Sequence, residues 1–280
     1  MLLKLSSLLA TLSLSIGTKL EEATRAFEIG ELPRVLELAK AGCPDELEGA
    51  RLNYLAGEVE LLLGAPAEAE ALFRAVLAKR PKALPAQVGL GRALTAQAKF
   101  DEAGKALEAA LGSDAKDVGA LSAHGLLLSI TGQSEKACQE LRQAFELDPK
   151  GALTVRAYVE ALLRADENPS AAEVIEAFIA ARPKHPMGPF LLAWTLERDG
   201  EDAQAIERYQ EALTNDPNFI DAHKNLAILC HTLSKTYQDK ARTLLAFEHY
   251  ERYFALGGKD QELRTMYADL LKFKGQILGQ

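Results

Sequence analysis

The sequence repeats with a period of 34 residues, and this period constrains the fold more than any other feature. One series of prolines keeps it, at Pro81, Pro149, Pro183 and Pro217. A series of alanines keeps it at Ala69, Ala103, Ala137, Ala171 and Ala205. A third series of mostly small residues falls at Gly57, Gly91, Gly125, Val159, Ala193 and Ala227. Three independent series with one period predict an array of similar structural units that stack side by side.

Each unit is predicted to contain two helices joined by a short turn. In the clearest unit, apolar residues follow helical spacing over 118–130 and again over 135–147. Between these segments, Gly132 suits the end of one helix and Ser134 suits the start of the next. Pro149 then stops the second helix. The composition agrees, because only 6% of the residues are aromatic and the chain is rich in Ala, Leu and Glu, which favour helices. The predicted fold class is therefore all-α.

The pattern resembles the tetratricopeptide repeat (TPR) family, whose unit is a 34-residue helix–turn–helix with the consensus W-x2-L-G-x2-Y…A-x3-F…P. The matching segments are Gln87-x2-Leu90-Gly91-x2-Leu94 with Ala103-x3-Leu107, and Leu121-x2-His124-Gly125-x2-Leu128 with Ala137-x3-Leu141 and Pro149. Glu60 departs from the family pattern, since it stands where an aromatic residue is usual. The resemblance implies a right-handed α-α superhelical solenoid of tandem helix-turn-helix repeats, with a C-terminal capping helix and no sheet.

The period divides the chain into units. Five regular units are expected at 50–83, 84–117, 118–151, 152–185 and 186–219, preceded by a degenerate hairpin at 18–49. An extended final hairpin is expected at 220–258, followed by a capping helix at 259–280. The final hairpin is longer because its small alanine is Ala246, seven residues later than the period requires. Seven residues make about two helical turns, so the two helices can lengthen while their apolar faces still meet.

Residues 1–17 allow two interpretations. They could form an amphipathic first helix, because five apolar residues share one side at helical spacing: Leu5, Leu8, Leu9, Leu12 and Ile16. Such a helix could cap the array or mediate self-association. Alternatively, the positive start, the apolar run and the small residues Ser15 and Gly17 are typical of a weak secretory signal. The first interpretation predicts a cytoplasmic protein, and the second a periplasmic or envelope-associated one.

Composition and motifs disfavour several classes of function. The formal net charge is -8, which disfavours binding to a nucleic-acid backbone. The three cysteines, Cys43, Cys138 and Cys230, lie far apart, so neither a disulfide framework nor a cysteine zinc site is expected. The sequence has no phosphate-binding loop, dinucleotide motif, zinc-protease motif or nucleophile elbow. We therefore expect a protein that is not an enzyme, with no catalytic residues, no cofactor and no metal.

The resemblance implies that a partner binds in a concave groove lined by the first helix of each unit. Aromatic and arginine side chains are the usual anchors of such contacts. The expected partner-binding residues are Arg51, Tyr54, Arg92, Leu126, Arg156, Glu160, Arg164, Phe190, Trp194, Arg198 and Lys224. Phe190 and Trp194 stand one helical turn apart, so we expect them to anchor a peptide or helix near the extended hairpin.

One known binding mode of the family is not expected here. TPR domains that clamp the carboxylate tails of heat-shock chaperones carry a Lys and an Asn one turn apart, then an Asn, then Lys and Arg. The equivalent pairs in this chain are Tyr54/Glu58, Val88/Arg92 and Arg156/Glu160, and the matching Asn is Asn225 beside Lys224. The carboxylate clamp is therefore absent.

Two classes of function remain at this point. The first is a non-catalytic adaptor or scaffold that binds a protein partner, as a peptide, a helical segment or part of a multiprotein complex. The second is a regulatory or substrate-recruiting subunit of an enzyme or of an envelope-assembly system, such as a pilus or secretion machinery, whose catalysis lies on another chain.

Overall fold

The computed structural model describes residues 18–272 except residue 238, and it describes only the backbone of residues 235–237. Within this part of the chain there are 15 α-helices and no strand, which confirms the predicted all-α fold class. The helices are α2 (Lys19–Glu28), α3 (Leu32–Lys40), α4 (Glu46–Leu62), α5 (Pro66–Lys79), α6 (Leu84–Ala96), α7 (Phe100–Ser113), α8 (Val118–Ile130), α9 (Ser134–Leu147), α10 (Ala152–Arg164), α11 (Asn168–Ala181), α12 (Met187–Arg198), α13 (Asp202–Asn215), α14 (Ile220–Tyr237), α15 (Lys240–Ala255) and α16 (Gln261–Lys272). The alternatives proposed for residues 1–17 lie outside the described residues.

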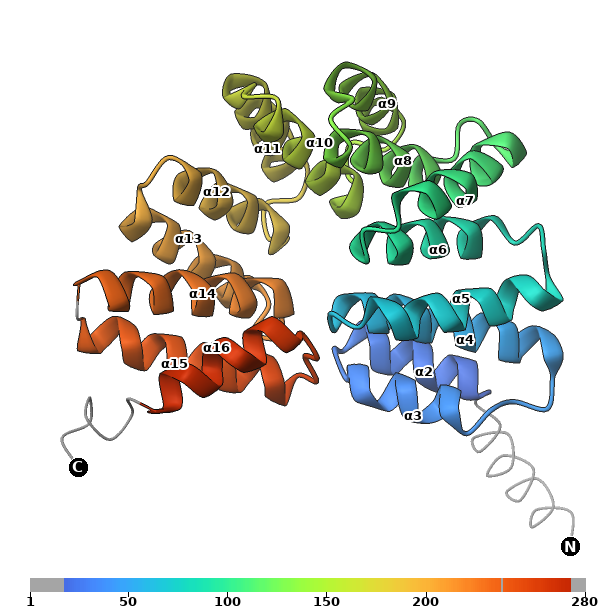
Figure 1. Ribbon diagram of the computed structural model, residues 1–280, viewed down its shortest axis with the longest axis horizontal. Coiled ribbons are helices and arrows are strands. Elements are labelled where there is room, and N and C mark those ends of the chain that lie inside the picture. The colour runs from blue at the N-terminus through green and yellow to red at the C-terminus, as the bar shows by residue number, and fades with distance from the viewer. Residues whose placement is uncertain (1–17, 238, 273–280) are drawn as a thin grey trace, which may run out of the picture.

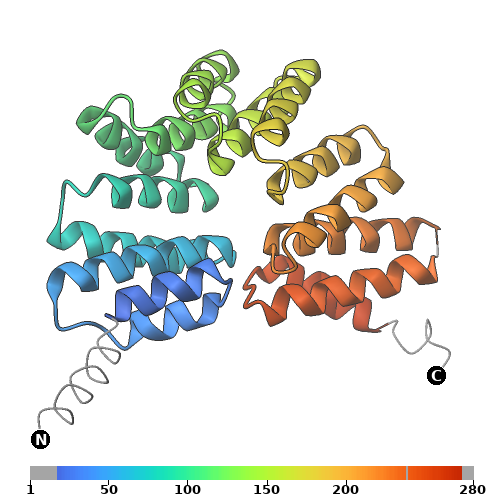
Figure 2. The ribbon, with the colours of Figure 1, turned by 180° about the vertical axis from the view of Figure 1, so that it is seen from behind.

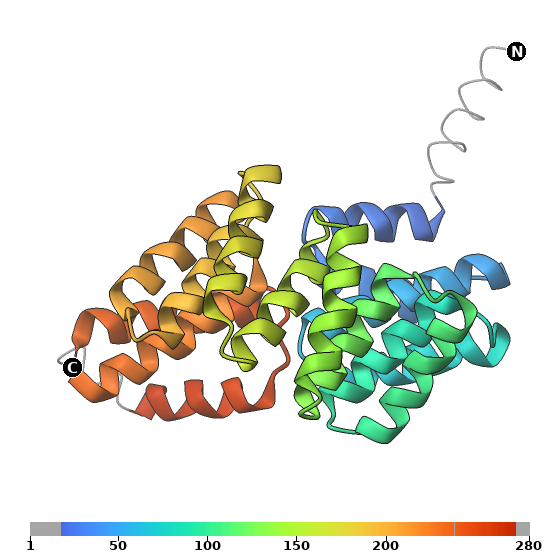
Figure 3. The same ribbon diagram turned by 90° about the horizontal axis from the view of Figure 1, so that it is seen from above.

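Consecutive helices pair as hairpins, and the hairpins stack into a superhelix that turns back on itself (Figure 1). From behind, the first helices and the last helices face each other at the same end of the molecule (Figure 2). From above, the first and second halves of the chain lie on opposite sides of α10 (Figure 3). The solenoid is therefore closed into a ring rather than left open as an arc.

The turn inside each hairpin uses one backbone conformation that also repeats every 34 residues. Six residues at this spacing have positive φ angles: Gly30 (78°), Gly64 (77°), Ala98 (57°), Gly132 (83°), Asp166 (59°) and Gly200 (78°). A positive φ ends a helix and frees the chain to start the next one, and glycine adopts it without steric cost. Two of the six sites, Ala98 and Asp166, carry a side chain that is strained there.

Small residues allow the two helices of a hairpin to approach closely. A Cβ atom added to Gly125 of α8 would lie 2.6 Å from Cγ of Leu141 on α9. A Cβ atom on Gly57 of α4 would lie 2.7 Å from the ring of Phe73 on α5. Both large side chains are fully buried. Each large residue therefore fills the space that the facing glycine leaves open.

The ring is closed by a contact between the α4–α5 turn and the α15–α16 turn. Lys259 donates from Nζ to both carboxylate oxygens of Glu60, at 2.7 and 2.6 Å. Its backbone N–H donates to the carbonyl oxygen of Leu63 at 2.6 Å, and the Tyr253 hydroxyl donates to the same oxygen at 3.3 Å. We call these four residues the seam. The seam satisfies a carbonyl at the end of α4 that a helix leaves without an internal partner.

Candidate binding groove

A cavity of about 560 Å³ lies on the inner face of the ring. It is lined mainly by α4, α6, α8 and α10, which are the first helices of four successive hairpins, and by Asp221 at the start of α14. Its apolar wall includes Leu61, Leu62, Val88, Leu126, Ile130 and Leu153. Its charged lining residues are Glu58, Arg92, Asp117, Arg156, Glu160 and Asp221.

The repeat period explains why these side chains meet. One row of lining residues has a spacing of 34 residues: Tyr54, Val88, Ser122 and Arg156. A second row lies one helical turn further on: Glu58, Arg92, Leu126 and Glu160. Because the units stack in register, equivalent positions of successive first helices become neighbours in space. The cavity is therefore formed by positions that the repeat predicts.

Ion pairs connect different repeats across the cavity. Arg92 donates from Nη1 to Glu58 Oε2 at 2.7 Å, which joins α6 to α4. Arg156 donates from Nη1 to Asp221 Oδ2 at 2.8 Å, which joins α10 to α14 across 65 residues of sequence. Burial, together with the nearby negative charge of Glu58, raises the pKa of the Tyr54 phenol to about 12. Tyr54 is therefore a neutral hydroxyl at physiological pH.

The structure brings together five of the residues expected in the groove and places the others elsewhere. The five that line the cavity are Tyr54, Arg92, Leu126, Arg156 and Glu160. The remaining six, which are outside its lining, are Arg51, Arg164, Phe190, Trp194, Arg198 and Lys224. The cavity thus covers the first part of the predicted groove and not the part near the extended hairpin.

The expectation that Phe190 anchors a ligand in the groove is wrong. Its side chain is only 3% exposed, and its ring packs 5.7 Å from that of Tyr209 and 5.3 Å from that of Phe219. Trp194, one turn later on α12, is half-buried against the same core. A buried aromatic ring holds its own neighbours together and has no free surface for a partner.

The other expected cations outside the cavity are engaged in ion pairs or exposed to solvent. Arg164 pairs with Glu160 on its own helix at 3.1 Å, and Arg198 pairs with Asp166. Lys224 donates to Asp260 at 2.6 Å, which ties α14 to the start of the capping helix α16. Arg51 is exposed near the start of α4.

Sequence reasoning missed two acidic residues of the cavity. Asp117 precedes α8 and accepts the Ala120 N–H at 2.7 Å, so its role as a helix cap hides its second position on the cavity wall. Asp221 belongs to a distant hairpin and reaches the cavity only because the superhelix closes. The capping pattern predicts the first of these positions, whereas no local pattern predicts the second.

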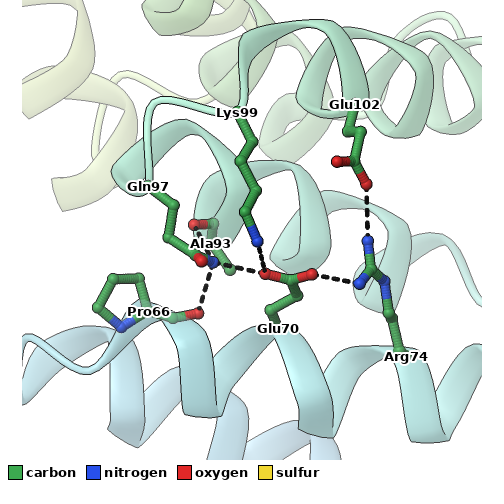
Figure 4. Close-up of polar contacts among 7 residues, drawn as sticks. All are labelled: Pro66, Glu70, Arg74, Ala93, Gln97, Lys99 and Glu102. Atoms are coloured by element: carbon green, nitrogen blue, oxygen red, sulfur yellow. Dashed lines mark hydrogen bonds and ion pairs between the residues drawn. The ribbon is translucent and has the colours of Figure 1, made fainter.

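A second polar cluster surrounds Glu70 on α5, outside the cavity (Figure 4). The buried Glu70 carboxylate accepts hydrogen bonds from Lys99 at 2.9 Å and from Gln97 at 2.7 Å, and it pairs with Arg74. These bonds, led by the one from Lys99, lower the pKa of Glu70. Gln97 also donates to the Pro66 carbonyl oxygen at 3.1 Å. The cluster holds the α6–α7 turn against α5, so its role is structural.

Two buried histidines meet between α14 and α15. The Nδ1 atoms of His223 and His249 lie 2.9 Å apart, and His223 Nε2 lies 3.0 Å from the Pro217 carbonyl oxygen. The carbonyl requires a proton on His223 Nε2, so His223 Nδ1 accepts the proton carried by His249 Nδ1. Burial lowers the pKa of both rings, that of His249 to about 4. The pair is therefore neutral at pH 7.

Two searches of the described residues gave no site of another kind. Between residues 18 and 272, leaving out residue 238, no three His, Cys, Asp or Glu side chains gather in a way that could hold a metal ion. Over the same stretch, no helix has the length and apolar character needed to cross a membrane.

Comparison with known proteins identifies the repeat. Three family models, each described as a tetratricopeptide repeat, match residues 60–125, residues 20–84 and 157–218, and residues 118–150. No curated protein matches the sequence.

Several solved structures share the fold. A tetratricopeptide repeat protein from Parabacteroides merdae is 15% identical over 90% of this chain and 97% of its own, with a TM-score of 0.57. A thermophilic TPR protein from Thermus thermophilus is 18% identical over 64% of this chain and 98% of its own, with a TM-score of 0.56. The APC/C hetero-tetramer Cut9–Hcn1 is 15% identical over 90% of this chain and 48% of the matched chain, with a TM-score of 0.55. At these identities the likeness shows the fold alone.

Proposed function

Because the chain belongs to the tetratricopeptide repeat family, whose arrays generally mediate contacts between proteins, we propose that it is a non-catalytic adaptor that holds a segment of a partner protein in the inner cavity. The observation that carries this proposal is the cavity itself. It combines an apolar wall with a small number of fixed polar groups, which is the usual composition of a binding site.

The size of the cavity limits what it can hold. One turn of helix with its side chains, about 10–12 Å across and 5.4 Å long, occupies about 470 Å³. The cavity of about 560 Å³ therefore takes little more than one turn, or a short extended stretch. A partner would place a few anchoring side chains there and lay the rest of its surface elsewhere on the ring.

A matched pair of leucine-to-tryptophan variants tests the proposal. Leu126 is half-buried on the cavity wall, so Leu126→Trp fills part of the cavity. Leu147 is 48% exposed at the end of α9, away from the cavity, so Leu147→Trp is the control. Both variants are first checked for an unchanged helical circular dichroism spectrum and melting temperature. We then expect Leu126→Trp, and not Leu147→Trp, to lose proteins that the wild-type chain captures from the cells that produce it. Equal recovery with both variants would contradict the proposal.

A further inference from the structure

The charges of the cavity wall are unbalanced in a way that selects among ligands. Among the residues that the structure describes, the lining contains four carboxylates and two guanidinium groups. Both arginines are already engaged, Arg92 with Glu58 and Arg156 with Asp221. The acidic side chains that remain are Asp117 and Glu160, from the start of α8 and the middle of α10. The lining therefore carries a net negative charge.

The surroundings of Glu160 show where a ligand cation would sit. Its side chain is 15% exposed, and it pairs at 3.1 Å with Arg164, a residue of the same helix whose side chain is 50% exposed. Solvent screens this pairing, so it compensates the Glu160 charge only weakly. A ligand that covers the cavity removes water from the carboxylate, and the cost is offset when the ligand supplies a cation of its own.

The apolar wall sets the second requirement. Leu153 lies on the lining of the cavity next to Thr154 and is 52% exposed, an unusual position for a large apolar side chain. Val88 and Leu126 continue the apolar surface on α6 and α8. Burial of such surface favours a ligand with aliphatic or aromatic side chains by roughly 25 cal/mol for each Å² covered.

From these observations, and resting on the proposed function, we propose that the cavity binds a short linear peptide that combines apolar side chains with a lysine or an arginine placed against Glu160. An acidic peptide would add like charge to the wall and is disfavoured. A purely apolar peptide would leave the Glu160 carboxylate without a ligand cation.

The test uses random heptapeptides displayed on phage, selected against the intact chain and, in parallel, against Leu126→Trp. Sequences enriched only on the wild-type chain are synthesised with a fluorophore, and their affinity is measured by fluorescence anisotropy. We expect them to contain apolar residues and at least one Lys or Arg. We expect Glu160→Gln to weaken their binding by about fivefold, which corresponds to an ion pair of about 1 kcal/mol. The control, Glu173→Gln on the exposed face of α11, is expected to leave the affinity unchanged.

The outcomes separate the two proposals. If the peptide carries Gln in place of its basic residue, Glu160→Gln should have no further effect, because the pair is already broken. Selection of acidic or purely apolar peptides, or equal affinity for the wild type and Glu160→Gln, would overturn the charge preference while leaving the adaptor function standing. Failure to enrich any sequence over the Leu126→Trp selection would overturn the adaptor function itself.

Discussion

The carboxylate of Glu60 lies 2.6 and 2.7 Å from the ammonium group of Lys259, although 199 residues of sequence separate them. Glu60 is 7% exposed and belongs to the fourth turn of α4, while Lys259 lies just before α16. Glu60 occupies the position where the family usually has an aromatic residue. The departure from the consensus thus has a structural cause, because a carboxylate at this site bonds to the other end of the ring.

The seam is expected to contribute to stability. Lys259→Met would leave the buried Glu60 carboxylate without its cation, which we expect to cost about 1–3 kcal/mol. The double variant Glu60→Leu with Lys259→Met should recover part of this loss, since it removes both charges. Urea denaturation measures these changes, and small-angle scattering should show a larger radius of gyration for Lys259→Met. The matched control Lys184→Met replaces an exposed lysine and should change stability by less than about 0.5 kcal/mol. Equal unfolding midpoints for the two single variants would contradict a stabilising seam.

Ala98 is expected to be a site where glycine stabilises the fold. Its φ angle of 57° is strained for any residue with a Cβ atom, and four of the six equivalent turns already use glycine. Ala98→Gly should therefore raise the free energy of unfolding by about 1 kcal/mol. Ala109→Gly, at an exposed position inside α7, should lower it by about 1 kcal/mol. Thermal unfolding of both variants checks the opposite signs, and a loss of stability in Ala98→Gly would refute the account.

The close approach of α8 and α9 predicts the reverse effect at Gly125. An added methyl group would clash with the fully buried Leu141, so Gly125→Ala should destabilise the fold by about 1–3 kcal/mol despite its better helix propensity. At Gly112, near the end of α7, a Cβ atom meets nothing within 4 Å. Gly112→Ala should consequently stabilise by about 0.5 kcal/mol. Differential scanning calorimetry of the two variants would expose an error in the helix packing if both moved the melting temperature the same way.

The His223–His249 pair makes stability depend on pH. Because burial holds the pKa of His249 near 4, below its unfolded value of about 6.5, the unfolded chain binds the proton more readily. The contribution of the pair is full above about pH 6.5 and is lost as the pH falls from there toward 4. Urea unfolding of the wild type between pH 7.5 and pH 5 should show this loss, and His249→Phe should show a smaller one.

His124 provides a control of opposite sign for the pH experiment. Its hydrogen bond to Glu140, at 2.8 Å, raises its pKa, so its contribution is full at low pH and is lost as the pH rises through the raised value. Replacing His124 by Gln should therefore make the loss of stability on acidification larger. The same pH slope in the wild type and both variants would show that neither histidine is linked to folding.

Trp194 is expected to affect folding more than binding. Its side chain is half-buried against the core and lies outside the cavity lining. Trp194→Ala should cost about 2 kcal/mol of stability, less than the truncation of a fully buried aromatic residue. It should leave the affinity for cavity-binding peptides unchanged, as measured by anisotropy well below the melting temperature. Weakened binding with an unchanged melting temperature would mean that the binding surface extends to α12.

The local part of the fold could be predicted from the sequence, and the reason is its repetition. Each 34-residue unit repeats the same caps, turn and small-residue contact, so one unit reports on the others. The cavity residues Tyr54, Arg92, Leu126, Arg156 and Glu160 follow the same register. Their alignment depends on contacts between neighbouring units alone.

Closure of the ring could not be predicted in this way. The position of the last hairpin relative to the first is the sum of many small rotations between units, and no single contact reveals that sum. Asp221 reaches Arg156, and Lys259 reaches Glu60, because of this accumulated geometry. The burial of Phe190 has a different cause, since the rings of Tyr209 and Phe219 cover a position that the repeat alone assigns to the groove.

The contact between the two ends changes how an array of repeats can come apart. A linear stack frays at its termini, because each outermost unit has only one neighbour to hold it. In this chain the α4–α5 and α15–α16 turns hold each other, so fraying at either end requires the seam to separate first. Truncation at one terminus would therefore weaken the opposite terminus as well, and the units behave as links of a closed circuit rather than as a row.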